Sequence, residues 1–142
     1  LLHLLCSFGK DGVIIRINNM QLQILKTMYD RRTKVMMKNI AFAEVLKLKD
    51  QIQYQTGQVV SRTLVQNNAV SVTLFSFDKD EEISTHESGG DAFVTCLDGV
   101  GRITIDGVEY EVHEGESIVM PAKHPHAVYG KEQFKMLLVV IF

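Results

Sequence analysis

Histidine is the residue type of this sequence best suited to metal or ligand chemistry, and His86 and His126 are two of its five histidines. Neutral imidazole binds divalent ions such as Fe, Mn, Ni, Zn and Cu, and it also forms hydrogen bonds with small polar ligands. Two further groups lie near them: Asp91, five residues after His86, and His124, two residues before His126. Residues two apart in a strand share a face, so His124 and His126 could point the same way. Side chains of these types can bind a metal ion or a small polar ligand, and the fold decides which of them share a site.

The elements that must position these side chains are predicted to be short strands. Residues 69–77 alternate in the manner of a strand, and the Asp106-Gly107 dipeptide between two β-rich segments is a strong hairpin signal. Residues 134–142 are almost continuously apolar, which is typical of a strand buried on both faces. After a short helix at 39–48, strands are expected over residues 58–65, 69–77, 92–97, 101–105, 108–112, 117–120 and 134–142. The predicted fold class is all-β, a sandwich or barrel.

Apolar residues with strand periodicity predict the core. The candidates are Val70, Val72, Leu74, Val94, Ile103, Ile105, Val112, Ile118, Met136, Leu138 and Val140. Phe93 and Met120 are expected to pack rather than to contact a cofactor. Cys96 shares strand parity with Val94 and is expected to be a small buried hydrophobe, because no neighbouring base would make it a thiolate.

Residues 115–126 resemble the second motif of the cupin superfamily, in which Gly, Pro, Gly and His recur at fixed spacing. Gly115, Pro121 and His126 fall in register with that motif, while Lys123 replaces its middle glycine. The resemblance extends over roughly residues 37–142. It implies an all-β fold of the cupin jelly-roll β-barrel type with a short N-terminal extension, in a protein that is usually a homodimer.

Residues 86–99 resemble the first cupin motif, in which two histidines, a glutamate and a glycine recur. His86 takes the first histidine position and Gly99 the glycine position, whereas Ser88 and Ala92 stand where the second histidine and the glutamate belong. Many cupins hold a metal ion inside the barrel mouth with three histidines and one glutamate. This chain keeps only His86 and His126 at those positions.

Asp91 could replace the missing glutamate, but it lies one residue from the expected position. A regular strand would turn it to the opposite face, whereas a bulge at Gly89-Gly90 would turn it inward. His124 could supply the missing imidazole, or it could lie on the rim of the barrel. Glu87 is expected to be a solvated loop acid. Without a metal, the two histidines could bind a small polar or anionic ligand or simply hydrogen-bond to backbone carbonyls.

The composition fits one globular domain. The chain has 142 residues, of which 46% are hydrophobic and 23% charged, with a net charge of -2. It contains no apolar run long enough for a membrane helix and no basic aromatic stripe, so no membrane or nucleic-acid partner is expected. A Ser-His-Asp ordering, a glycine-rich phosphate loop and a CxxC pair are all missing. Two cysteines, Cys6 and Cys96, suit a reducing cytoplasm.

The charge is unevenly distributed, which marks a boundary near Met36. Residues 1–35 carry six basic and two acidic side chains, whereas residues 36–142 carry nine and fifteen. Residues 1–35 are an N-terminal extension with two open interpretations. In the first, they are translated upstream sequence, and Arg31-Arg32 are encoded by AGG codons that form a bacterial ribosome-binding site before Met36. In the second, they are a helical or strand arm that packs on a partner subunit, with a helix expected over residues 20–28.

The sequence therefore predicts a small cytoplasmic bacterial cupin, a homodimer whose barrel occupies residues 36–142. It is expected to bind a divalent metal, a small polar ligand or both through His86 and His126. The alternative is a metal-dependent enzyme of the dioxygenase, isomerase or decarboxylase class, with Asp91 or His124 completing the metal site. A sensing or structural module without metal is a third interpretation.

Overall fold

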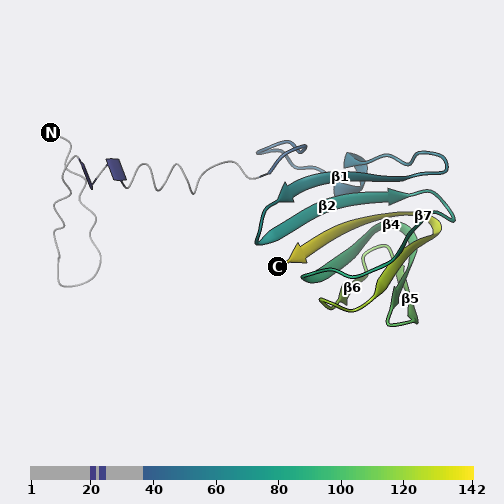
Figure 1. The fold of residues 1–142 in the computed structure, drawn as a ribbon. Coiled ribbons are helices and arrows are strands. Elements are labelled where there is room, and N and C mark those ends of the chain that lie inside the picture. Colours follow the sequence, from purple (N-terminus) through teal and green to yellow (C-terminus); the bar gives the residue numbers. More distant parts are fainter. Residues whose placement is uncertain (1–19, 22, 25–36) are drawn as a thin grey trace, which may run out of the picture. The chain divides into compact units, whose positions relative to one another are not determined.

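The computed structural model describes residues 20–21, 23–24 and 37–142 (Figure 1). Residues 20, 21, 23 and 24 are helical, and the remainder of the helix expected over residues 20–28 lies outside the described residues. The chain divides after Met36, and Met37–Phe142 form one compact unit. The charge boundary expected near Met36 falls at this division.

Residues 37–142 form an all-β fold, which confirms the predicted class. Its only helical element within this range is a short 3-10 turn, η1, at Leu48–Gln51. The strands are β1 (Val59–Gln66), β2 (Val70–Phe77), β3 (Glu82–His86), β4 (Asp91–Ile105), β5 (Val108–His113), β6 (Ser117–Met120) and β7 (His126–Ile141). No helix among the described residues is long and apolar enough to cross a bilayer.

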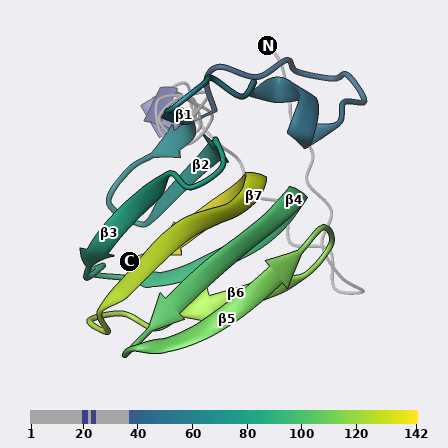
Figure 2. The same cartoon turned by 90° about the vertical axis from the view of Figure 1, so that its right-hand side faces the viewer.

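Two long strands, β4 and β7, organise the sheet. They pair with each other in antiparallel fashion over most of their lengths, and the strand order is β1-β2-β7-β4-β5. β3 pairs with the first part of β7, whereas β2 pairs with its second part; β6 pairs with the first part of β4. Figures 1 and 2 show these strands curling so that their inner faces enclose a common interior. This is the jelly-roll barrel that the cupin resemblance implied.

Several boundaries differ from the sequence prediction. The strands expected at 92–97 and 101–105 are a single strand, β4, whose pairing with β7 shifts between Cys96 and Asp98 and again between Gly99 and Gly101. Gly99 has φ +74, and a Cβ there would lie 1.7 Å from the carbonyl oxygen of Gln133. The turn signal Asp98-Gly99 therefore marks a bulge inside a strand rather than the end of one.

Two strands extend beyond what apolar periodicity indicated. β3 was not predicted because, apart from half-buried Ile83, its residues are exposed. β7 begins at His126, not at Phe134: residues 126–130 are buried or half-buried, and the exposed polar residues 131–133 separate them from the apolar run that starts at Phe134. The helix expected at 39–48 is wrong: Asn39 and Ala43 have positive φ, which interrupts a right-handed helix.

The interior contains a large apolar cluster, in which the rings of Phe77 and Phe134 pack at 5.5 Å between centroids. Burial of one such ring contributes about 1.5–3 kcal/mol. Of the eleven core candidates, this cluster buries Val94, Ile103, Val112, Met136 and Val140, and half-buried Ile105, Ile118 and Leu138 pack against it. Cys96 is also buried there, as predicted, and burial raises the pKa of its thiol to about 11.

A second apolar cluster lies on the opposite face of β2. Leu74 packs there with Leu64 of β1 and with Ile52, which follows η1, and Val72 is packed against them. The remaining core candidate, Val70, is half-buried. Leu74 and Val72 are therefore core residues of a layer outside the barrel, because the segment before β1 covers this face. The inner face of β2 is formed by Phe75 and Phe77 instead.

Candidate functional site

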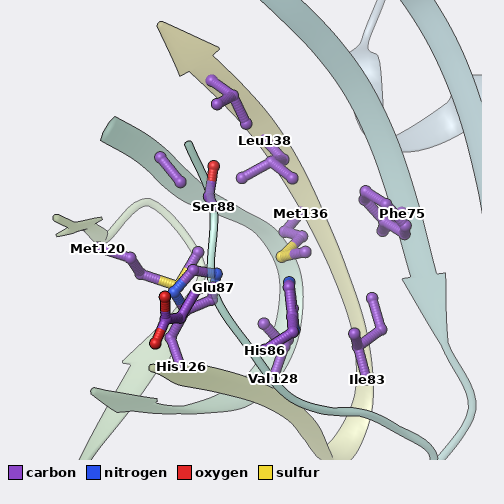
Figure 3. A pocket seen from close by; sticks show the side chains of 12 residues that line it. Phe75, Ile83, His86, Glu87, Ser88, Met120, His126, Val128, Met136 and Leu138 are labelled. Atoms are coloured by element: carbon purple, nitrogen blue, oxygen red, sulfur yellow. The ribbon is translucent and has the colours of Figure 1, made fainter. Parts of the chain in front are cut away.

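A cavity of about 220 Å³ opens inside the barrel between β2, β3, β4, β6 and β7 (Figure 3). Most of its wall is apolar. Phe75, Met120, Met136 and Leu138 contribute large side chains, and the polar groups come from His86, Glu87, Ser88 and His126. The cavity is therefore a largely apolar chamber with polar groups from β3, the loop after it and the start of β7.

The sheet register explains which residues reach this cavity. His86 and His126 are paired residues of β3 and β7, so their side chains emerge side by side. On β4, Ala92 and Val94 are buried inward, whereas Asp91 and Phe93 are exposed. As a result, positions 86, 88, 92 and 126 all line the cavity. These are the four positions at which the cupin resemblance places metal ligands, two of them occupied here by Ser88 and Ala92.

The two imidazoles are held by backbone carbonyl groups. Nδ1 of His86 lies 2.8 Å from the carbonyl oxygen of Ser84, and Nδ1 of His126 lies 2.8 Å from that of His124. Their rings meet edge to face, with centroids 4.5 Å apart. His126 is 2% exposed, while His86 is exposed at the mouth. Within the described part of the chain, no hydrogen bond is made by either Nε2 atom.

The structure does not bring Asp91 to the cavity. Its register with Ile141 continues without a shift into the pairing of Ala92 with Val140, so the bulge that would have turned it inward is not formed. Instead, Oδ1 of Asp91 accepts a 2.9 Å hydrogen bond from the backbone N–H of Ala122. Asp91 therefore fixes the loop between β6 and β7.

His124 lies on the rim. Its Nδ1 is 2.7 Å from Oδ2 of Asp106, in the β4–β5 turn, and its side chain is half exposed. It does not line the cavity, but its carbonyl oxygen is the group that holds His126. The contribution of His124 to the site is thus made through its backbone.

The position of Glu87 was only partly predicted from the sequence. It is exposed, as expected of a loop acid, yet it also lines the cavity between His86 and Ser88. Met120 is buried, as expected of a packing residue, and it also forms part of the cavity wall. The second cupin motif could have suggested this, because Met120 directly precedes its proline.

The donor set does not fit a firmly held metal ion. Among the residues that the structure describes, no group of three or more His, Cys, Asp or Glu side chains is arranged to hold one. Ser88 and Ala92 supply neither an imidazole nor a carboxylate at the two positions that face His86 and His126. Two imidazoles fall short of the three or four protein ligands of typical sites.

The comparisons with known proteins agree with this fold. The cupin domain family model matches residues 73–142. A conserved Streptococcus pyogenes protein of unknown function is 49% identical, with a TM-score of 0.75 over 77% of this chain and 96% of that one. A cupin superfamily protein from Desulfitobacterium hafniense is 33% identical, with a TM-score of 0.72 over 75% and 97% of the two chains.

A third solved structure, the cupin 2 conserved barrel domain protein from Leptotrichia buccalis, is 43% identical, with a TM-score of 0.67. That alignment covers 68% of this chain and 47% of the other. No curated protein matches the sequence. The fold and the site define a barrel of the cupin type, and the chain belongs to the cupin superfamily.

Proposed function

We propose that this cupin binds a small organic molecule inside the barrel, through His86 and His126 and without a resident metal ion. The observation that carries the proposal is the environment of His126. This residue is 2% exposed and lines an apolar cavity, yet its Nε2 atom has no hydrogen-bond partner in the described part of the chain. Nε2 of His126 is therefore available to a ligand that enters the cavity and brings a hydrogen-bond donor.

The shape of the site supports the same proposal. Ligand sites are concave, mostly apolar and furnished with few polar groups, and this cavity has that character. The metal-dependent enzyme considered from the sequence would need a third protein ligand. Asp91 and His124, the two candidates, make other contacts: Asp91 holds the backbone of Ala122, and His124 pairs with Asp106.

Binding of monocyclic fragments, followed by NMR of the methionine methyl groups, tests the proposal. We expect fragments to shift the signals of Met120 and Met136, and we expect Ala92→Leu, which fills the cavity, to abolish those shifts. Ala69→Leu, at an exposed turn position, is the matched control. If Ala92→Leu does not fold, the smaller Ala92→Val change serves the same purpose.

Metal analysis separates the alternatives. We expect protein purified without added metal, and then loaded with Zn²⁺, Mn²⁺ or Ni²⁺ and dialysed, to retain much less than one equivalent. Stoichiometric metal that is lost in the His86→Ala/His126→Ala double variant would overturn the metal-free proposal and would support a metal-binding cupin, whether or not it is an enzyme.

A further inference from the structure

We infer that the molecule bound in this cavity is a neutral monocyclic phenol, with the ring in the apolar chamber and the hydroxyl group hydrogen-bonded to the imidazole of His126. The inference rests on the proposed function and adds the chemical class of the ligand. It follows from three features of the cavity: the tautomer of the histidines, the nature and volume of the wall, and the charge at the mouth.

The backbone fixes the tautomer of both histidines. A carbonyl oxygen only accepts hydrogen bonds, so the 2.8 Å contacts to the carbonyls of Ser84 and His124 place a proton on Nδ1 of each ring. In neutral imidazole the other nitrogen, Nε2, then carries a lone pair. His86 and His126 therefore offer hydrogen-bond acceptors, and a matching ligand must bring a donor such as a hydroxyl group.

The wall favours an aromatic body for that ligand. Met120 and Met136 are both buried and both line the cavity, and Phe75 contributes an aromatic ring (Figure 3). Thioether sulfur atoms make favourable contacts with aromatic rings, worth about 0.3–1.5 kcal/mol each. An apolar cavity of about 150 Å³ suffices for benzene. The 220 Å³ present here accommodates one ring with a hydroxyl substituent.

The mouth disfavours an anionic ligand. Glu87 lines the cavity, and among the described residues no lysine or arginine does so. A carboxylate would therefore enter next to a like charge without a cationic partner, which is costly in an apolar chamber. These features together distinguish a phenol from benzoate, which has the same ring and a negative charge, and from toluene, which has the same size and no donor.

Titration of the intact protein with phenol, toluene and benzoate tests the inference, with the Met120 and Met136 methyl signals as the readout. We expect phenol to bind about threefold to tenfold more tightly than toluene, the range that one net hydrogen bond provides. Benzoate should bind most weakly. His126→Leu should remove the preference for phenol while toluene still binds, and His113→Leu, an exposed histidine on β5, should leave it unchanged.

The outcomes separate this inference from the proposed function. Toluene and phenol binding equally, or benzoate binding most tightly, would overturn the phenol inference and leave the cavity as a binding site. If none of the three compounds binds, the proposed function fails with it. Should His126→Leu not fold, His126→Phe keeps a ring at this position without a hydrogen-bond acceptor and must remove the preference for phenol; an unchanged preference would overturn the inference.

Discussion

The hydroxyl group of Tyr54 donates a 2.7 Å hydrogen bond to Oδ2 of Asp98, and Nζ of Lys49 lies 3.4 Å from Oδ1 of the same carboxylate. These contacts tie the segment before β1 to the bulge in β4. The Tyr54 bond, followed by the Lys49 contact, lowers the pKa of Asp98 below its usual range. Burial and the Asp98 carboxylate together raise the pKa of Tyr54. The pair should therefore make stability depend on pH at both ends of the scale.

The pKa of Asp98 is lower in the folded than in the unfolded protein. Its contribution to the free energy of unfolding is therefore complete above the unfolded pKa of about 3.9 and is lost as pH falls through the folded pKa. Because the pKa of Tyr54 is raised, its effect on the pH dependence of stability is the opposite. Its contribution to the free energy of unfolding is present below about pH 10 and is lost at higher pH. We predict that Tyr54→Phe loses less stability than the wild type between pH 5 and pH 2, because Asp98 no longer gains its main hydrogen bond.

Urea unfolding measured across this range checks the prediction. Asp50→Asn is the control, since the Asp50 side chain makes no hydrogen bond or ion pair within residues 37–142. It should follow the wild-type curve. If the wild type and Tyr54→Phe lose the same amount of stability between pH 5 and pH 2, the Tyr54–Asp98 hydrogen bond does not set the pH dependence.

Lys123 adopts φ +62, in the left-handed region, at the position where the cupin motif has glycine. A residue with a Cβ pays about 1–2 kcal/mol for that conformation. We predict that Lys123→Gly stabilises the fold by about 0.5–1 kcal/mol, since glycine avoids the strain but loses more chain entropy on folding. Lys47→Gly, at φ -95, should not stabilise. Chemical denaturation gives the free energy of unfolding of both variants. A loss of stability in Lys123→Gly would contradict the strain argument.

Much of the fold and part of the candidate site could be predicted from the sequence because they depend on local signals. The strand at Ser117–Met120 has its predicted bounds, and Asp106 and Gly107 both have positive φ, as the two central residues of a type I′ hairpin require. The second cupin motif placed His126 correctly at the cavity. In each case the decisive information lies within a few residues.

What could not be predicted depends on long-range pairing. The bulge at Gly99 exists because the backbone of Gln133 approaches it, and residues 34 apart carry no shared sequence signal. Val72 and Leu74 are core residues, as expected, but alternation alone cannot tell that their face of β2 lies outside the barrel. The segment containing Ile52 covers that face. Whether Asp91 or Ala92 points inward was decided by the pairing of β4 with β7.

Phe93 of β4 pairs with Val119 of β6 on one side and with Val139 of β7 on the other, forming an apolar row on the outer face of the sheet. Phe93 is 41% and Val119 50% exposed. Contiguous exposed apolar residues are typical of protein contact sites, and one face can pair with itself across a two-fold axis. We predict that the expected homodimer uses this row.

Light scattering coupled to size exclusion gives the mass directly. The wild type should be dimeric and Phe93→Thr/Val119→Thr largely monomeric. Val108→Thr, which alters a valine 53% exposed on β5, should remain dimeric. A monomeric wild type, or a double variant that stays dimeric, would exclude this face as the interface.

The positions of Ser88 and Ala92 lead to a gain-of-function prediction. Both line the cavity with His86 and His126, but neither is a metal ligand. Replacing them by Ser88→His and Ala92→Glu would place three imidazoles and one carboxylate around one space, which suits divalent transition metals. We predict that this double variant binds Co²⁺ or Ni²⁺ at least about 10–100-fold more tightly than the wild type, because even an outer-shell partner changes metal affinity by that factor.

Titration calorimetry and the visible absorption of Co²⁺ measure the effect. The control is Ser88→His/Asp91→Glu, which introduces the same residue types but places the glutamate on the opposite face of β4, next to Ala92. It should bind more weakly than the double variant, because its carboxylate faces away from the imidazoles. Ala92 is 1% exposed, so Ala92→Glu introduces a carboxylate at a buried position, and the folded variant should also gain thermal stability on addition of metal. If it does not fold without metal, Ser88→His alone must still bind Co²⁺ more tightly than the wild type, and equal affinity would show that position 88 does not share a site with His86 and His126.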